Sequence, residues 1–181
     1  MRREWMVRRV ETVDDAFVDA LADVLIDCVE GDASVSFMHP LTRERAMQFW
    51  RGVANEVIAR QRVLLVADDD RGLCGTVQLT LGLPENQPHR ADVSKMLVHR
   101  RARRQGLGAA LMRGAEAAAR ERGRELLVLD TASEDAKRLY ERLGWVRVGV
   151  IPDYALLPRG GYCDTVVYYR KLGCPSPRRA E

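Results

Sequence analysis

The chain of 181 residues is poor in cysteine and lysine and has no long apolar run. Its four cysteines form no C-x-x-C pair, and its three histidines do not complete a zinc-ligand spacing, so we expect free thiols and no metal site. No segment approaches the roughly 18 apolar residues of a membrane-spanning helix, and the first residues lack the apolar core of a secretory signal. These absences predict a cytoplasmic protein that does not bind a membrane.

The composition is that of an ordinary folded domain, with 46% apolar and 30% charged residues. The net charge is only +3, and aromatic residues do not interleave the basic ones, which argues against nucleic-acid binding. The length fits one domain over residues 1–173. Residues 174–181 contain two prolines, and we expect a flexible tail there.

Hydrophobic periodicity predicts alternating strands and helices. The expected strands span residues 7–10, 63–67, 74–81, 93–98, 126–130, 146–150 and 165–169. The expected helices span residues 14–29, 42–60 and 106–122, and a fourth begins at Ser133 or Asp135 and ends at Leu143. Early neighbours form antiparallel hairpins, whereas the later strand–helix–strand units imply parallel neighbours. The expected fold class is α/β, with a mixed, mostly antiparallel sheet flanked by helices.

The sharpest motif is an apolar strand followed by a basic loop and a glycine-containing turn. Residues 93–98 form the strand, four arginines follow between positions 100 and 104, and Gly106 and Gly108 open an amphipathic helix. The first N–H groups of a helix have no intrahelical acceptor, and glycines let a ligand approach them, so this turn is suited to an anion. The turn matches neither a Walker loop nor a complete dinucleotide fingerprint.

The segment Arg103-x-x-Gly106-x-Gly108 resembles the acyl-CoA signature of the GNAT N-acetyltransferases, [RQ]-x-x-G-x-[GA]. Downstream, the segment from Ala136 through Tyr140 to Gly144 and Trp145 is similar to the A-x-x-x-Y-x-x-x-G-[FW] segment of that family. The resemblance covers roughly residues 5–172. It implies a GNAT fold, acetyl-CoA as co-substrate, and direct transfer of the acetyl group to a primary amine without an acyl-enzyme.

The resemblance also implies which residues bind acetyl-CoA. The backbone of the strand end would hydrogen-bond the pantetheine arm, through Met96, Leu97 and Val98. The turn would hold the pyrophosphate, through Arg103, Arg104, Gln105, Gly106, Leu107, Gly108 and Ala109. Many members carry Asn seven residues before the tyrosine, but this chain has Ser133 there. Ser133 would either contact the pantetheine weakly or only cap its helix.

Three residues are candidates for the chemistry. Tyr140 takes the place of the tyrosine that meets the CoA sulfur in the family, and a phenol there can protonate the departing thiolate. An amine must lose a proton before it attacks a thioester. Asp92 enters the strand where many relatives carry a glutamate base, and Asp130 ends the next strand. Either aspartate could be the base, hold the substrate's ammonium group, or serve only the structure.

A narrower resemblance, to the tabtoxin-resistance type of this family, concerns the substrate. It is carried by residues 33–38, 90–93, 129–131 and 148–154, and it implies acetylation of an amino-acid-like toxin or antibiotic. Protein N-termini, polyamines or a non-catalytic acyl-CoA-binding role are the alternatives. The sequence is compatible with a monomer or a homodimer.

Overall fold

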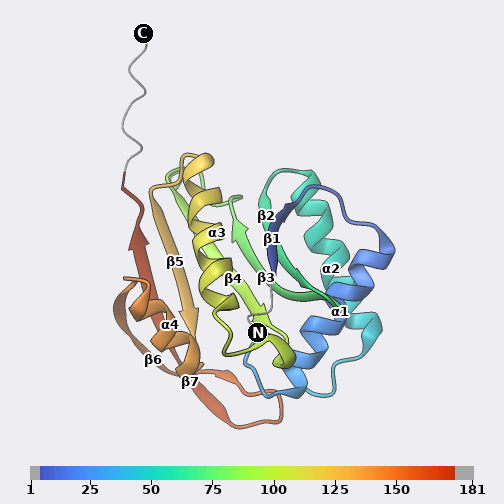
Figure 1. Ribbon diagram of the computed structural model, residues 1–181. Coiled ribbons are helices and arrows are strands. Elements are labelled where there is room, and N and C mark those ends of the chain that lie inside the picture. Colours follow the sequence, from blue (N-terminus) through green and yellow to red (C-terminus); the bar gives the residue numbers. More distant parts are fainter. Residues whose placement is uncertain (1–4, 174–181) are drawn as a thin grey trace.

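The computed structural model describes residues 5–173, and the expected tail at 174–181 lies outside them. The strands are β1 (Met6–Val10), β2 (Arg62–Asp69), β3 (Gly72–Thr80), β4 (Arg90–Val98), β5 (Leu126–Thr131), β6 (Val146–Leu156) and β7 (Tyr162–Lys171). The helices are α1 (Asp15–Glu30), α2 (Arg43–Ile58), α3 (Leu107–Glu121) and α4 (Glu134–Arg142), with a 3-10 turn, η1 (Arg100–Ala102), between β4 and α3 (Figure 1). Among these residues no helix is long and apolar enough to cross a bilayer.

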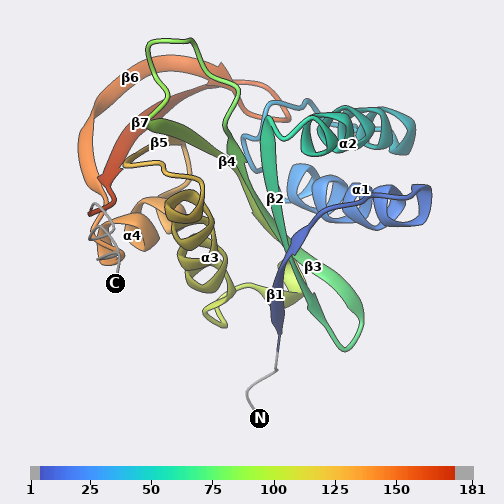
Figure 2. The ribbon, with the colours of Figure 1, turned by 90° about the horizontal axis from the view of Figure 1, so that it is seen from above.

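The strands form one sheet, in the order β1-β2-β3-β4-β5-β7-β6. Only β4 and β5 pair in parallel, and every other neighbouring pair is antiparallel. Helices α1 and α2 cover one face, and α3 and α4 cover the other (Figure 2). Each face has its own buried cluster, which contains Leu25 and Trp50 on the α1–α2 side and Leu111 and Leu127 on the α3–α4 side. The predicted fold class is therefore confirmed.

The helix starts follow from short polar side chains in the sequence. Asp14 accepts a hydrogen bond from the backbone N–H of Phe17 at 2.8 Å and begins α1, and Thr42 begins α2 in the same way. Of the two candidates for the fourth helix, Ser133 is the N-cap, since its hydroxyl accepts from the backbone N–H of Ala136 at 3.3 Å. Such caps satisfy N–H groups that have no acceptor within the helix.

The last two strands are longer than the periodicity predicts. The segment expected to be a proline- and glycine-containing loop instead extends β6 as far as Leu156 and starts β7 at Tyr162. A register shift between Ile151 and Ala155 accommodates Pro152, which has no N–H to donate. The strand is at the sheet edge, where a proline costs no inner hydrogen bond, so Pro152 does not end it.

The strand–helix–strand rule holds once and fails once. The segment β4–α3–β5 gives the expected parallel neighbours. Strands β5 and β6, which flank α4, are not neighbours because β7 lies between them and pairs antiparallel with both. Which strands become neighbours depends on pairing between segments far apart in the sequence, and local sequence patterns do not predict that pairing.

Candidate active site

The turn between β4 and α3 leaves a row of backbone N–H groups without acceptors. Within residues 5–173, the N–H groups of residues 104–109 have no hydrogen-bond partner, whereas the next one, on Ala110, donates to the Gly106 carbonyl at 3.2 Å. The turn is made by two left-handed residues, Arg104 at φ 58° and Gly106 at φ 90°. A helix start with this many free N–H groups binds anions.

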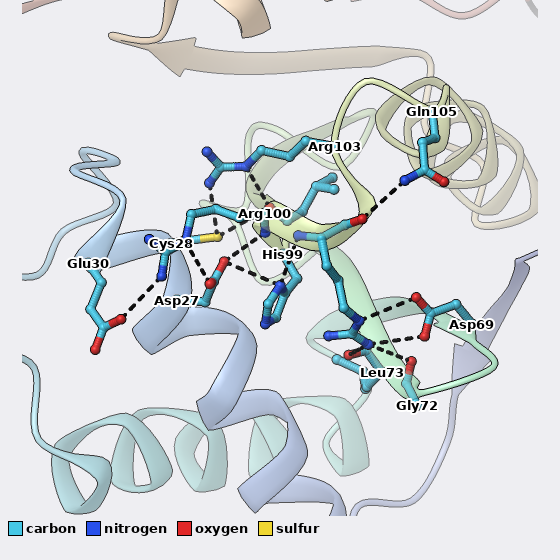
Figure 3. A network of polar contacts seen from close by, with 12 residues as sticks. Asp27, Cys28, Glu30, Asp69, Gly72, Leu73, His99, Arg100, Arg103 and Gln105 are labelled. Carbon is cyan, nitrogen blue, oxygen red and sulfur yellow. Dashed lines mark hydrogen bonds and ion pairs between the residues drawn. The ribbon is translucent and has the colours of Figure 1, made fainter. Parts of the chain in front are cut away.

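The four arginines of the preceding loop do not all face that turn. Arg100 and Arg101 are held by carboxylates, because Arg100 pairs with Asp27 at 2.8 Å and Arg101 pairs with Asp69 at 3.1 Å (Figure 3). Arg104 is exposed and has no ion pair or side-chain hydrogen bond with the described residues. The charges of Arg100 and Arg101 are therefore already compensated, and neither was among the predicted acetyl-CoA-binding residues.

Arg103 turns back toward the protein. Its Nε donates to the Val98 carbonyl at 3.0 Å, and its Nη2 lies 3.9 Å from the Cys28 sulfur (Figure 3). Burial raises the pKa of the Cys28 thiol, although Arg103 opposes that effect, so the thiol is protonated and unreactive. Arg103 therefore links the end of β4 to α1 and places a positive charge beside the turn.

Asp27 anchors the start of the turn to α1. Its buried carboxylate accepts from the backbone N–H of Arg100 and from the Arg100 side chain, both at 2.8 Å. His99 lies 3.5 Å from the same carboxylate and accepts from the backbone N–H of Arg101 (Figure 3). Burial lowers the pKa of His99, which keeps its ring neutral and able to accept.

Strands β4 and β5 part soon after they begin to pair. Their parallel ladder covers only Arg90–Asp92 against Leu126–Val128. Beyond this point the β5-facing edge of β4 has no strand partner among the described residues, and this edge includes Met96, Leu97 and Val98. An extended ligand with amide groups can pair with such an edge as another strand would. The resemblance predicts the pantetheine arm at this edge, where the Val98 carbonyl already accepts from Arg103 Nε.

A bulge in β4 sets the orientation of the strand end. Its pairing with β3 shifts between Thr76 and Gln78, and Lys95 lies in the bulge with φ 48°. The extra residue reverses the alternation, so Met96 and Val98 pack on the α3 side and Leu97 packs on the α1 side. Without the bulge, the strand end would present the opposite side chains to α3.

Gly108 has a packing role that the sequence did not reveal. A Cβ atom at this position would lie 3.0 Å from Cδ2 of Leu139 in α4 and 3.7 Å from the Met96 sulfur. The glycine therefore lets α3 approach α4, in addition to any approach of a ligand to the turn. At Gly106 a Cβ atom would meet only Trp5, at 3.9 Å, so this glycine is required for its left-handed backbone.

Asp92 lies on β4 at the last paired position before the strands separate. Its neighbours Ala91 and Val93 belong to the α3-side cluster, so its own side chain projects from the α1–α2 face. Arg90 donates to its carboxylate at 3.2 Å. Burial raises the pKa of Asp92, and Asp130 adds to this, while Arg90 opposes it. A carboxylate with a raised pKa is a better proton acceptor than an ordinary aspartate.

Asp130 lies on β5 and projects from the same face, since Leu127 and Leu129 pack on the other. Its carboxylate accepts a hydrogen bond from the hydroxyl of buried Thr165 in β7, at 2.7 Å. It also shifts the pKa of Asp92, Lys95 and Tyr140, which come from β4 and α4. The charge of Asp130 therefore acts on three titratable groups around the place where β4 and β5 part.

Tyr140 approaches that region from the opposite face, on α4. Its ring is buried against Trp145 and Tyr168, with centroids 5.9 Å away in each case. Its hydroxyl has no hydrogen-bond partner among the described residues. Burial, with the charge of Asp130 as a smaller cause, raises the pKa of Tyr140 well above its ordinary value. The phenol is therefore protonated at neutral pH and can donate.

Ser133, in the place where relatives carry Asn, caps α4. Its hydroxyl accepts from Ala136, and its own backbone N–H donates to the Thr131 hydroxyl at 3.1 Å. Of the two roles considered for it, the structure displays the capping role.

Sequence reasoning missed three polar residues of this region. Lys95 donates to the hydroxyl of Ser36 at 3.0 Å, and Thr165 orients Asp130. Lys95 is one of only three lysines in an arginine-rich chain, which was the available signal. No signal singled out Ser36 or Thr165, because each acts through a residue far away in the sequence.

Comparisons with known proteins agree with this geometry. Residues 60–147 match the family model of the acetyltransferase (GNAT) domain. An uncharacterized N-acetyltransferase of Azospirillum brasilense, encoded in the hisH-hisA intergenic region, is 29% identical over 126 residues, which cover 68% of this chain and 73% of that protein.

Two solved structures with bound acetyl-CoA share the fold. The yncA acetyltransferase of Salmonella typhimurium superposes with a TM-score of 0.73 at 18% identity, covering 98% of this chain and 99% of that one. A phosphinothricin acetyltransferase of Sinorhizobium meliloti gives a TM-score of 0.76 at 16% identity, covering 98% and 93%.

The residues of this chain fit acetyl-CoA. The free N–H groups of residues 104–109 suit a pyrophosphate, and the open edge of β4 suits the amides of a pantetheine arm. The domain match, the shared fold and these two features agree with one another. Residues 60–147 are similar to the acetyltransferase (GNAT) domain, and the chain has the fold of solved acetyltransferases that bind acetyl-CoA.

Proposed function

We propose that the enzyme transfers the acetyl group directly to the primary amine of a small, amino-acid-like molecule. The observation that carries this proposal is the meeting of groups from both sheet faces where β4 and β5 part. Asp92 and Asp130 come from the α1–α2 face, and Tyr140 comes from the α4 face. The electrostatic influence of Asp130 on both Asp92 and Tyr140 supports their proximity.

The proposed binding of acetyl-CoA depends on the turn before α3 and on the end of β4. The N–H groups of residues 104–109 would hold the pyrophosphate, with Arg103 and Arg104 adding positive charge. The backbone of residues 96–98 would hold the pantetheine arm. Acetyl-CoA, when bound, supplies a thioester carbonyl as the acyl donor.

The acceptor side is walled by two segments that are far apart in the sequence. The backbone N–H of His39 donates to the Pro158 carbonyl at 2.8 Å, and Arg159 donates to the Glu30 carbonyl at 3.2 Å. The loop between α1 and α2 therefore lies against the β6–β7 hairpin, as both ribbon views show (Figures 1 and 2). These contacts join the two segments beside the place where β4 and β5 part, which supports a small acceptor over a protein chain.

Asp92 would remove the proton from the substrate's ammonium group, directly or through a water molecule. Its raised pKa suits a proton acceptor working near neutral pH. Asp130, held by Thr165, would bind and orient the same ammonium group. Two carboxylates on one face also compensate the charge of a cationic substrate.

Tyr140 would hold a proton for the departing sulfur. Its hydroxyl is protonated at neutral pH and has no partner among the described residues, so it is available to a ligand atom. No side chain is needed as a nucleophile, and the buried thiols of Cys28 and Cys74 have raised pKa values. Direct transfer is therefore the simplest scheme that these residues allow.

The test is an acetylation assay that follows the release of free CoA thiol over a panel of primary amines. The panel contains amino acids, phosphinothricin, polyamines and a peptide with a free N-terminus. We expect the amino-acid-like amines to be acetylated best. Activity on the peptide or on polyamines alone would overturn the proposed acceptor.

Tyr140→Phe tests the chemistry on the best substrate. We expect kcat to fall by roughly 10²–10⁴-fold while calorimetry shows unchanged binding of acetyl-CoA. Tyr162→Phe is the matched control, since Tyr162 is 72% exposed. An unchanged kcat in Tyr140→Phe would remove this hydroxyl from the mechanism.

A further inference from the structure

We propose that Lys95, held by Ser36, binds a carboxylate of the acceptor, so that the enzyme selects amino acids over amines that lack an acid group. This inference rests on the proposed function and adds a second recognition point to it. Asp92 and Asp130 would hold the positive end of the substrate, and Lys95 would hold the negative end.

The first observation is a partly buried ammonium group without a carboxylate partner among the described residues. Lys95 Nζ donates to the Ser36 hydroxyl at 3.0 Å and lies 5.7 Å from the centroid of the Phe49 ring. No acidic side chain of residues 5–173 lies within ion-pair distance of it. A hydroxyl and an aromatic face compensate a partly buried charge only in part, so the site favours an anion.

The second observation is backbone strain at both ends of this contact. Lys95 has φ 48° in the β4 bulge, and Ser36 has φ 75° in the loop between α1 and α2. Neither residue is a glycine, so each left-handed conformation costs free energy. Two strained residues, 59 positions apart, thus meet through their side chains. Such strain concentrates at binding sites, where it positions particular groups.

The third observation places Lys95 at the acceptor side. It follows Asp92 on β4 by three residues, and the charge of Asp130 influences its pKa. Burial, with Arg62 as a second cause, lowers the pKa of Lys95, and Asp130 opposes this. Arg62 is itself paired with Glu56 at 2.7 Å and with Gln78 at 2.6 Å. Arg90 is likewise paired, with Asp92 at 3.2 Å, whereas Lys95 has no carboxylate partner among the described residues, so we assign the substrate carboxylate to Lys95.

The chemistry requires a substrate that carries both charges. An amino acid brings its ammonium group to the two aspartates and its carboxylate to Lys95 in one binding event. The corresponding amide or decarboxylated amine keeps the first contact and loses the second. It also leaves the partly buried Lys95 charge without an anion, so the enzyme should discriminate against it.

The experiment compares kcat/KM for an amino acid, its primary amide and its decarboxylated amine. The amino acid used is the one that the enzyme acetylates best in the amine panel. We expect the wild-type enzyme to prefer the acid by about 10- to 100-fold, as for the loss of a hydrogen bond to a charged group. In Lys95→Met the preference should disappear through a higher KM for the acid, with the amide unchanged.

Further variants distinguish the effect of the Lys95 charge from effects on the fold. Lys95→Arg keeps the cation and should keep the preference. Ser36→Ala removes only the hydroxyl that holds Lys95 and should reduce the preference in part. Lys171→Met is the matched control, because Lys171 is exposed at the end of β7. Calorimetric binding of acetyl-CoA checks that each variant is folded.

The possible failures are distinct. If the wild-type enzyme acetylates acid and amide equally, the carboxylate subsite is wrong and the proposed function stands. If Lys95→Met binds acetyl-CoA and retains the full preference for the acid, Lys95 is not the subsite. If the wild-type enzyme acetylates only peptide N-termini, the proposed function falls and the subsite falls with it.

Discussion

Replacing Asp27 by alanine should loosen the start of the anion-binding turn. The Asp27 carboxylate, 9% exposed, accepts from the backbone N–H of Arg100 at 2.8 Å and ties the turn to α1. In Asp27→Ala this N–H loses its acceptor inside the protein. A fully buried donor without a partner costs about 1–3 kcal/mol, which is an upper bound for this part-buried N–H. The side-chain bond of Arg100 adds little, because that guanidinium is half exposed and regains water.

This free energy determines the expected drop in the thermal midpoint and the expected rise in the Kd of acetyl-CoA. For a chain of this length, 1 kcal/mol lowers the thermal midpoint by about 2–4 °C, so we expect a drop of about 2–12 °C. Binding of acetyl-CoA must dock the loosened turn again, so its Kd should rise by at most the same free energy, about 5- to 150-fold. Thermal unfolding followed by circular dichroism and calorimetric titration measure the two effects.

Glu30→Ala is the control, because Glu30 pairs with the same Arg100 side chain at 3.3 Å but is 51% exposed. We expect no change in midpoint or in Kd for this variant. Equal losses in Asp27→Ala and Glu30→Ala would show that the buried backbone contact is not what holds the turn. Lower stability without a change in Kd would show that the anchor serves the fold alone.

Three further variants test the site. Gly108→Val should cost about 1–3 kcal/mol of stability, since its Cβ would lie 3.0 Å from Leu139, and it should also weaken acetyl-CoA binding. Unchanged unfolding by urea would contradict this packing role. In the wild-type enzyme, kcat/KM should rise with pH as Asp92, whose pKa is raised, loses its proton. Asp92→Asn should abolish this rise and leave only the rise that comes from deprotonation of the substrate amine. An unaltered pH–rate profile would exclude Asp92 as the base. The same variant should be more stable in urea at neutral pH, because a raised carboxyl pKa destabilises the fold above the unfolded pKa. Thr165→Val should raise KM more than it lowers kcat, because Asp130 loses the 2.7 Å bond that orients it, and steady-state kinetics would refute this if KM stayed the same.

Local features of the sequence were sufficient for much of the fold. Asp14 and Thr42 cap α1 and α2, the turn before Gly72 joins a hairpin, and the helix after the basic loop begins at Gly106 as expected. These features could be predicted because their causes are short-range: a side chain caps a helix three residues ahead, and a glycine adopts a left-handed turn by itself. The same applies to the free N–H groups at the start of α3.

Only the tertiary structure decided how the site is assembled. The bulge at Lys95, which re-aims Met96, and the insertion of β7 beside β5 depend on pairing between distant strands. The contacts of Lys95 with Ser36 and of Asp27 with Arg100 span 59 and 73 positions. A sequence pattern reports the neighbours of a residue along the chain, whereas these contacts form only because the packed sheet and helices bring distant segments together. The sequence therefore determined which residues could bind and react, and the packing of the elements determined which of them meet.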